Sequence, residues 1–504
     1  MFPASFCLIL TTCVLIFLRK YMSILRRLPN LPGPPTSSWL FGHAMNIEHS
    51  PIGAHYNIWA EKYGSTYRLK GVFGIPVLSL ADPKGVNHVL NNTNYKRNED
   101  DNVALELFFG RSVFCVEGHE HKRMRKYLNS SFTSKSVANF SEVFFNLAYN
   151  LEEQWNKLSD AQINNIFDIT PTVYMLTLDA ISITMFNHNL SATTGEIPAL
   201  LNKIANAPNG VALSALASLF PLLLHLPSPM KNWCQNLRTR LGIIAKEVWS
   251  GKEGAGDYAS LLQSLAQESP PISQEEAVAQ IIGILFAGSE TTANVICECF
   301  HELARQPEIQ HRLREELSRF EALHGHPPGH DDLMNPAVLP YFDAVTKETM
   351  RTKAILVNIS REDVIPLQNP LPGTGIYEIK IPAGILIHIP VRDGINVDKK
   401  IWGPDASTFN PDRWVAPGGI PDTVKTIQAQ GHMLTFGDGP KVCLGRAFAL
   451  AEFKIVVSIM VRKFNFELDG SEIDFYHLGG NTIKPMVRGR ETEGVQLPLK
   501  VKHV

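Results

Sequence analysis

The sequence predicts a mainly α-helical protein with small peripheral β-sheets, preceded by a single N-terminal transmembrane helix. Three observations favour this fold class. The chain has 504 residues, 44% of them hydrophobic, most of its length carries helical patterns of apolar residues, and only two short hairpins are suggested. No alternation of strands with helices is visible, so a doubly wound sheet is not expected. At about 150 residues per domain, the length alone would give roughly three domains.

The N-terminal segment has the charge pattern of a membrane anchor. Residues 2–18 carry no charge, and Arg19 and Lys20 follow directly. A spanning helix needs about 17–25 apolar residues, so this segment is at the short end of the range. A cleaved signal peptide would carry its positive charge before the apolar run, and here the order is reversed. We therefore predict that residues 1–20 anchor the chain in the endoplasmic reticulum membrane, with the remainder in the cytosol.

A basic, proline-rich hinge is predicted at residues 21–38. Four prolines between residues 29 and 35 cannot continue a helix and favour a stiff, extended spacer. Residues 39–504 contain no internal linker and no repeat of about 20–50 residues. We therefore expect one catalytic domain behind the hinge, rather than the three that length alone suggests.

Composition excludes some partners. Lys and Arg total 47 and Asp and Glu total 49, which gives a net charge of −2. A near-neutral chain without a long basic run lacks the footprint of a nucleic-acid-binding protein, so we expect no such partner. We also expect the protein to be a monomer. The seven cysteines are scattered and form no CxxC pair. This favours a reducing compartment with one special thiol over a disulfide framework.

The two predicted hairpins lie far apart in the chain. The first joins Thr66–Lys70 to Val77–Leu80, and the second joins Ile376–Ile381 to Ile385–Ile389. Glycine- and proline-containing turn signals bracket the second pair. These strands account for the small peripheral sheets.

The apolar segment at residues 210–227 has two interpretations. Pro221 and His225 interrupt it, which weakens its reading as a second spanning helix. It is either buried core or a lip that packs on a substrate and dips into the bilayer surface.

A cysteine loop near the C-terminus carries the strongest functional signal. Phe436, Gly439, Cys443 and Gly445 are spaced F-x-x-G-x-x-x-C-x-G, and a helical pattern begins just after the cysteine. A thiolate at a helix N-terminus is stabilised by free backbone N–H groups and the helix dipole. Gly439 permits a tight turn, Gly445 permits a flat ligand to approach closely, and Lys441 adds positive charge. A lone cysteine is usually a small buried hydrophobe, but this pattern favours a functional thiol.

At this point the sequence resembles the cytochrome P450 family of haem-thiolate monooxygenases, over essentially all of residues 30–490 and the anchor before them. The resemblance implies the cytochrome P450 fold, with Cys443 as the axial ligand of a haem b iron and Phe436, Gly439 and Gly445 around the cofactor. The family often has arginine two residues before the cysteine. Lys441 stands there in this chain, which keeps the charge but not the guanidinium fork.

A second motif supports the resemblance. Glu348 and Arg351 lie three residues apart in a helical stretch after Pro340, so they share one helix face. In isolation they would be a surface ion pair. The family has an ExxR element with this spacing and a P-x-R-[FW] segment that matches residues 411–414. The implied role is structural, a buried triad of Glu348, Arg351 and Arg413 that supports the cysteine loop.

The stretch from Ser273 to Pro307 is predicted to be a long buried helix. It opens with an S-x-x-E capping box, ends at a proline, and is apolar on nearly all sides in its centre. Residues 287–292, A-G-S-E-T-T, resemble the family's oxygen-activation motif, which implies that Glu290 and Thr291 relay protons through water. The alternative is a glycine-tolerant helix with a satisfied polar patch.

His121 and Arg125 lie four residues apart and share a helix face. A solvated basic face is the default interpretation. Many fungal members of the family have a similar G-x-x-H-x-x-x-R segment, which implies that both residues bind haem propionate. The resemblance implies the same role for Arg361.

The electrons are expected from another protein. The chain has no G-x-G-x-x-G after a strand and no Walker A motif, and so no obvious nicotinamide or flavin site of its own. We expect NADPH to supply them through a separate flavoprotein reductase. A positive face for this partner would be formed by Lys122, Arg123, Lys126, Arg446 and Lys454.

The predicted function is insertion of one oxygen atom from O2 into an apolar small molecule, in fungal secondary metabolism such as terpenoid or polyketide tailoring. Two alternatives differ in class. One is a haem-thiolate isomerase or dehydratase that acts on a hydroperoxide without O2 or reductase, against which the intact Glu290–Thr291 pair argues. The other is a non-enzymatic haem carrier. The expected pocket walls are Val103–Phe114, Val211–Leu224, Ile284–Ala287 and Ile355–Val357.

Overall fold

The computed structural model describes most of the chain after the predicted anchor. The described residues are 28, 31–36, 38–97, 99–161, 163–190, 196–206, 226–249, 272–352, 357–478 and 482–504. The predicted anchor (1–20), most of the hinge and nearly all of the apolar segment at 210–227 lie outside them. Among the described residues, no helix is both long enough and apolar enough to cross a membrane.

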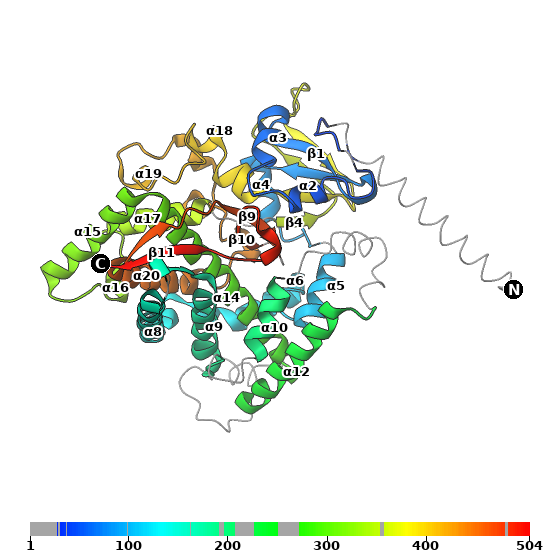
Figure 1. Ribbon diagram of the computed structural model, residues 1–504. Helices are drawn as coiled ribbons and strands as arrows, with labels where there is room; N and C mark the ends of the chain where they lie inside the picture. The colour runs from blue at the N-terminus through cyan, green and yellow to red at the C-terminus, as the bar shows by residue number, and fades with distance from the viewer. Residues whose placement is uncertain are drawn as a thin grey trace.

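Helices make up most of the described structure (Figure 1). Those of the first half are α2 (Ala44–Glu48), α3 (Tyr56–Tyr63), α4 (Pro83–Asn91), α5 (Glu99–Phe109), α6 (Gly118–Asn129), α7 (Ser134–Asn139), α8 (Ser141–Ala161), α9 (Thr170–Phe186), α10 (Glu196–Ala205) and α12 (Pro229–Trp249). Those of the second half are α14 (Gln274–Arg305), α15 (Pro307–His324), α16 (His330–Met334), α17 (Pro340–Thr352), α18 (Lys399–Trp402), α19 (Asp412–Val415) and α20 (Arg446–Lys463).

The strands form small sheets at the edges of this helical body. Strands β1 (Thr66–Lys70), β2 (Pro76–Leu80), β7 (Leu386–Ile389) and β4 (Val357–Ser360) form one sheet in that order, and β5 (Asp363–Pro366) pairs with β6 (Glu378–Ile381). Strand β11 (Pro498–His503) lies between β3 (Ile166–Asp168) and β8 (Phe464–Leu468), and β9 (Ile473–Leu478) pairs with β10 (Thr482–Val487). The predicted class, helix-dominated with small peripheral sheets, is confirmed for the described part of the chain.

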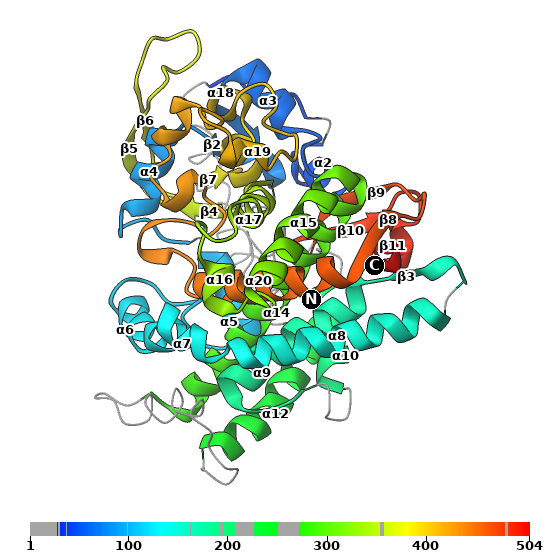
Figure 2. The same cartoon turned by 90° about the vertical axis from the view of Figure 1, so that its left-hand side faces the viewer.

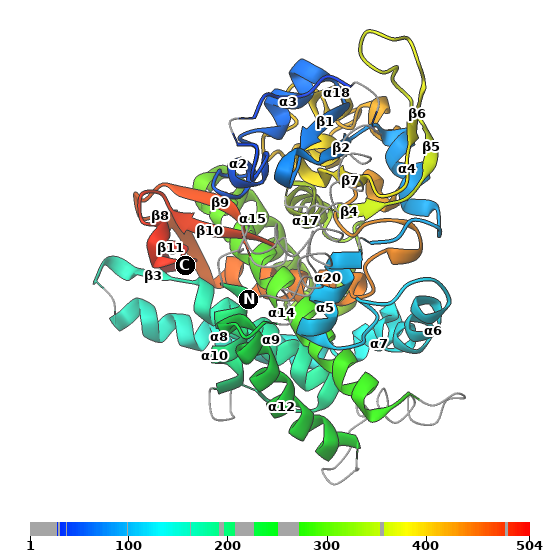
Figure 3. The same cartoon turned by 90° about the vertical axis from the view of Figure 1, so that its right-hand side faces the viewer.

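One long helix, α14, runs through the middle of the molecule (Figures 2 and 3). The predicted capping box is present, because the Ser273 hydroxyl accepts from the Glu276 amide and the Glu276 carboxylate accepts from the Ser273 amide. The helix ends at Arg305, since Pro307 opens α15. It packs against α9, α12, α20 and β10. A Cβ at Gly288 would come within 2.9 Å of the Ile181 side chain of α9, so the glycine allows these two helices to approach closely.

The first predicted hairpin is confirmed and the second is wrong. Strands β1 and β2 pair antiparallel, with Thr66 opposite Leu80. Strands β6 and β7 do form near their predicted bounds, but they do not pair with each other. Strand β6 pairs with β5, whereas β7 lies parallel to β2 and antiparallel to β4. The turn at residues 382–384 therefore carries the chain from one sheet to another, because both strands find longer-range partners.

Two hydrophobic cores flank the cysteine loop. The larger contains Trp155, Phe300 and Phe466, whose rings lie within 6.1 Å of one another, centroid to centroid. The smaller is built from β2, β6 and β7 and from segments that follow them, and it includes Leu434. Phe448 of α20 belongs to the larger core. The loop between Leu434 and Phe448 thus runs from one core to the other and is held at both ends.

Candidate functional site

The cysteine loop is a tight turn just before α20. The Cys443 amide donates to the Phe436 carbonyl at 2.7 Å. Gly439 has a positive φ of 67°, and a Cβ there would lie 2.3 Å from the Leu90 carbonyl oxygen, so only glycine fits. Gly445 differs, with φ at −87° and the Phe132 ring at 3.9 Å as the nearest atom to a Cβ. The protein itself does not require glycine at 445.

The Cys443 side chain is solvent-accessible although most of α20 behind it is buried. Its sulfur therefore lies on a wall that the surrounding protein does not cover. Desolvation by the surrounding protein raises the pKa of the Cys443 thiol. The Gly445 amide and the positive charges of Arg125 and Arg446 act on this pKa in the opposite direction. These groups favour the thiolate, as expected near a helix N-terminus.

Helix α6 contributes two basic side chains to this site. His121 is buried and Arg125 is half-buried. Burial lowers both pKa values, and the charges of Lys441 and Arg125 lower that of His121 further. Within the described part of the chain, neither side chain has a hydrogen bond or ion pair. Polar groups removed from water are normally satisfied, so the pair points to a ligand.

Lys441, in contrast, has a protein partner. Its ammonium lies 2.5 Å from the Glu117 carboxylate, which also accepts from the Arg97 amide at 3.1 Å. The Arg97 guanidinium donates to the Phe114 carbonyl, and its charge lowers the pKa values of His121 and Lys441. Arg97 thus joins the basic cluster, and our sequence reasoning missed it, because a lone arginine in a polar loop carries no distinguishing pattern.

Arg361 takes a different position. It donates to the Asn92 side chain at 3.1 Å and lies over the Tyr95 ring at 5.8 Å. The neighbouring Asn91 donates to Asp438 of the cysteine loop at 2.9 Å. Arg361 is therefore tied to the segment after α4 that contacts the loop, and not to His121 or Arg125.

Thr291 is exposed although both of its neighbours in α14 are buried. Its hydroxyl donates to the Ala287 carbonyl at 2.7 Å, which leaves the oxygen lone pairs available. An accessible hydroxyl in the middle of a buried helix marks the side of α14 that protein does not cover.

Glu290 is engaged elsewhere. One oxygen of its carboxylate, Oε1, accepts from the Thr482 hydroxyl and from the Lys484 ammonium, both at 2.7 Å. Adjacent residues in a helix point about 100° apart, so Glu290 and Thr291 lie on different sides of α14. The structure thus brings Glu290 to β10, a partner that sequence reasoning did not find.

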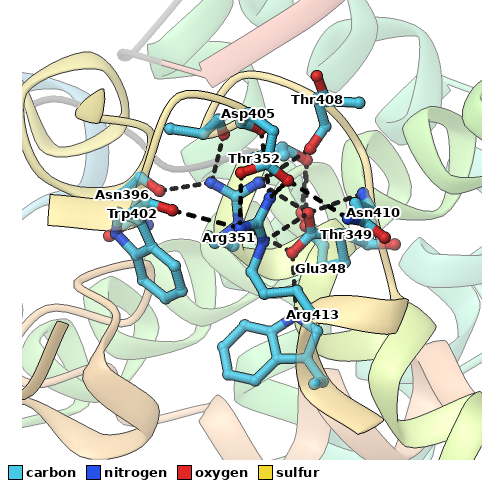
Figure 4. Close-up of polar contacts among 12 residues, drawn as sticks. Glu348, Thr349, Arg351, Thr352, Asn396, Trp402, Asp405, Thr408, Asn410 and Arg413 are labelled. Carbon is cyan, nitrogen blue, oxygen red and sulfur yellow. Dashed lines mark hydrogen bonds and ion pairs between the residues drawn. The ribbon is translucent and has the colours of Figure 1, made fainter. Parts of the chain in front are cut away.

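Glu348 and Arg351 of α17 form a fully buried ion pair (Figure 4). The guanidinium donates from Nε and Nη2 to the two carboxylate oxygens at 2.8 and 2.7 Å. Its other donors reach three carbonyls, those of Asn396, Ala406 and Thr408, at 2.7, 2.6 and 3.1 Å. All five N–H groups are thereby used, which a lysine could not match.

The same network reaches the cysteine loop. The Asn396 side chain accepts from the Leu434 amide and donates to the Thr435 hydroxyl, both at 3.0 Å. Phe436, whose carbonyl binds the Cys443 amide, follows directly. Arg351 is therefore connected to the loop through one asparagine.

Arg413 completes the group through a looser contact. Its Nε lies 3.5 Å from Glu348, whereas its Nη2 donates to Asp405 at 2.8 Å. Glu348 also accepts from the Trp414 indole and the Asn410 amide, both at 2.9 Å. Asp405 was not predicted, because it belongs to neither motif. Trp414 stands in the predicted P-x-R-[FW] segment, but its hydrogen bond to Glu348 was not predicted.

Aromatic side chains gather between α5 and α14. The Phe109 ring lies 5.4 Å from Phe286 and 6.0 Å from Phe114, centroid to centroid. A Cβ at Gly283 would come within 2.7 Å of the Phe114 ring. This ring therefore packs directly against the backbone of α14 at Gly283. The expected wall residues from α5 and α14 thus meet, whereas residues 355 and 356 lie outside the described part of the chain.

Comparisons with known proteins decide the family. The model of the cytochrome P450 family matches residues 32–485. The cytochrome P450 monooxygenase claU of Ampulloclitocybe clavipes is 34% identical, with 95% of this chain and 94% of the relative aligned. The corresponding values are 34%, 97% and 95% for claW of the same fungus, and 31%, 97% and 94% for cytochrome P450 monooxygenase 128 of Postia placenta. The chain belongs to the cytochrome P450 family.

It is accordingly an oxidoreductase of the monooxygenase class. The family implies a haem-thiolate iron, a redox partner that supplies electrons and an organic substrate. The residues present fit the cofactor. The chain offers an accessible thiol at Cys443. The side chains of His121 and Arg125 can donate hydrogen bonds and have no partner among the described residues. Gly445 has no close neighbour in the protein that would exclude a side chain.

Not all of the residues predicted to form a positive face on this cytochrome P450 are exposed. Lys122 and Lys126 are exposed on α6. Arg123 contacts the Glu276 carboxylate at 3.5 Å. Lys454 was wrongly assigned to this face, because its side chain is buried and binds Asp343 at 2.9 Å.

Replacing Arg351 with lysine tests the buried network. Lysine has three donors, so at least two of the five hydrogen bonds are lost. At roughly 1.5 kcal/mol for each bond to a charged group, the free energy of unfolding should fall by about 3 kcal/mol or more. Urea denaturation measures this, and absorbance gives the haem bound per protein, which should also fall.

Arg490→Lys is the matched control. Arg490 is 53% exposed and binds Glu493, which is 45% exposed, at 2.5 Å. Exposed pairs are screened by water and contribute little to stability, so this variant should keep the stability of the wild type. Equal stabilities of the two variants would contradict the role that we assign to Arg351.

Proposed function

We propose that this protein is a haem-thiolate monooxygenase that inserts one oxygen atom from O2 into an apolar organic molecule, with electrons supplied from NADPH by a separate flavoprotein reductase. Haem b, when bound, supplies the activation of dioxygen. The observation that carries the proposal is the accessible Cys443 thiol just before α20, together with His121 and Arg125 of α6, whose side chains have no hydrogen bond or ion pair among the described residues. The relatives are named monooxygenases, which favours this reaction over rearrangement of a hydroperoxide.

Each residue around Cys443 has one role in this proposal. Cys443 holds the iron as a thiolate, and the Gly445 amide stabilises its charge. His121 and Arg125 bind the propionates. Lys441 and Arg361 hold the flanking segments through Glu117 and Asn92.

Helix α14 is proposed to transfer protons. The Thr291 hydroxyl is accessible, and its donation to the Ala287 carbonyl leaves its lone pairs free to accept from a water molecule. Glu290 exchanges protons with this water through further water molecules, because its carboxylate lies on a different side of α14. General acid–base groups of this kind contribute about 10²- to 10⁴-fold to rates.

The substrate is proposed to be a terpenoid, a polyketide or a fatty-acid-like molecule. Phe109, Phe114 and Phe286 provide an apolar aromatic surface, which gains free energy by covering apolar area. A place in fungal secondary metabolism is proposed as well; the relatives named above come from fungi. We also propose one catalytic domain at residues 39–504, anchored by residues 1–20 in the endoplasmic reticulum membrane, acting as a monomer.

Cys443→Ala tests the thiolate ligand. The reduced, CO-treated wild type should show the red-shifted Soret band typical of thiolate-ligated haem, and the variant should lack it. Cys234→Ala, which changes a buried cysteine of α12, should retain it. A wild type without this band would refute the haem-thiolate assignment.

Phe109→Ala tests the substrate wall. Farnesol, lauric acid and an anthraquinone are titrated into the wild type, and the shift of the Soret band gives Kd. For a probe that binds, loss of a buried phenyl ring should raise Kd by about 10- to 100-fold, since its burial is worth roughly 1.5–3 kcal/mol. Leu323→Ala, at an exposed position, should leave Kd unchanged. An unchanged Kd in Phe109→Ala would remove this ring from the pocket.

Deletion of residues 2–20 tests the anchor. The full-length protein expressed in yeast should stay with the membrane pellet after alkaline carbonate extraction, because a spanning helix resists this treatment, whereas the deleted protein should move to the supernatant. Release of the full-length protein by carbonate would show that residues 2–20 do not span the bilayer.

A further inference from the structure

Lys484 and Glu290 form a buried ion pair between strand β10 and helix α14. The ammonium lies 2.7 Å from Oε1 of the carboxylate, and the side chains are 0% and 4% exposed. Lys484 also donates to the Asn206 side chain at 3.3 Å. Nothing in the sequence pattern distinguishes this lysine from surface lysines, and the family motif contains only the acid.

The carboxylate is held asymmetrically. Oε1 accepts from both Lys484 and the Thr482 hydroxyl. Oε2 is buried as well, but it has no hydrogen-bond partner among the described residues. A buried carboxylate oxygen without a partner is costly unless water or a reacting group uses it. One oxygen of Glu290 is thus held by two protein partners, whereas the other is available to water or to a reacting group.

The pair is also poorly explained by stability alone. Two charges removed from water lose hydration, and well-packed apolar residues of similar size are often as stable as a buried ion pair. Burial lowers the pKa of Lys484, and the charge of Glu290 opposes this. On the side of α9, the charge of Glu290 contributes to the raised pKa of Tyr174. The structure therefore places a lysine and a carboxylate together where apolar residues of similar size would often be as stable.

We propose that Lys484 is a positioning residue for Glu290, which keeps the acid ionised, occupies Oε1 with Thr482, and leaves Oε2 as the oxygen that transfers protons. This inference rests on the proposed monooxygenase function. In each transfer Oε2 accepts an excess proton that solvent delivers along a chain of water molecules and passes that proton on through water to the side of α14 that carries Thr291, so the carboxylate is restored and no hydroxide is left behind. Lys484 keeps its own protons throughout.

Infrared spectroscopy of the haem-loaded protein tests the charge state without turnover. In Lys484→Met the buried acid loses its countercharge, so Glu290 should become protonated and a carboxylic-acid carbonyl band should appear. Burial raises the pKa of Glu452, so an acid band from that residue is common to all variants. The additional band should therefore appear in the difference between Lys484→Met and the wild type, and it should be missing from the Lys484→Met/Glu290→Gln double variant. Lys484→Arg, which keeps the charge, should resemble the wild type. If Lys484→Met does not fold, Lys484→Gln provides the same comparison.

Turnover gives a second, independent measurement. With a flavoprotein reductase and whichever of farnesol, lauric acid and the anthraquinone binds, the product formed per NADPH consumed should fall at least about 10-fold in Lys484→Met. Lys484→Arg should recover part of this coupling. A merely structural role would not separate these two variants at equal haem content.

Lys454→Met is the matched control. Lys454 is a similarly buried lysine that binds a carboxylate at 2.9 Å, but its partner Asp343 also binds Lys347 at 2.8 Å. This variant should lose stability, gain no carboxylic-acid band and keep its coupling.

Two results would overturn the inference. One is the absence of a Glu290-dependent acid band in folded Lys484→Met. The other is such a band with coupling equal to that of the wild type. A wild type without the thiolate Soret band would instead refute the proposed function, and the infrared comparison would still decide whether Lys484 keeps Glu290 ionised.

Discussion

The arrangement of the site depends on one buried ion pair, Glu348 with Arg351. A guanidinium in the protein interior is tolerable only when its charge is neutralised and all its N–H groups are bound. Glu348 supplies the charge, and three backbone carbonyls supply the remaining acceptors. Those carbonyls belong to Asn396, Ala406 and Thr408, which lie before and after the short helix α18. The arginine therefore fixes both flanks of α18, and Asn396 links this arrangement to the cysteine loop.

The loop is constrained at its two ends by packing as well. Leu434 belongs to one hydrophobic core and Phe448 to the other, so the thiol lies where the cores meet. Helix α14 reaches the same region from residue 274 onward, and α6 reaches it from residue 118. Because groups from such distant segments must converge, no cut through residues 118–448 would leave a complete site. This is the reason for proposing one catalytic domain rather than the three that length alone suggests.

Local chemistry could be predicted from the sequence, but the choice of distant partners could not. The capping box at Ser273, the glycine turn at Gly439 and the start of α20 after Cys443 involve residues a few positions apart, so spacing specifies their geometry. The pairing of β6 and β7 failed for the opposite reason. Alternating apolar residues and a turn identify two strands, yet each can pair with any compatible edge. Asp405, Arg97 and Lys484 were missed likewise, because their partners lie far away in the chain or carry no spacing signature.

Lys454 and Lys484 show what this limit means for electrostatics. Both are lysines in ordinary sequence surroundings, and a charge count treats them as surface groups. Folding buries both and pairs each with a carboxylate. At Asp343 a second lysine makes the pairing redundant, whereas Glu290 has one cationic partner among the described residues and one idle oxygen. The family motif in α14 supplies the acid, but β10, almost 200 residues later in the chain, sets its charge and orientation. Two cytochrome P450 chains with identical oxygen-activation motifs can therefore differ in proton delivery, according to what the C-terminal strand places against the acid.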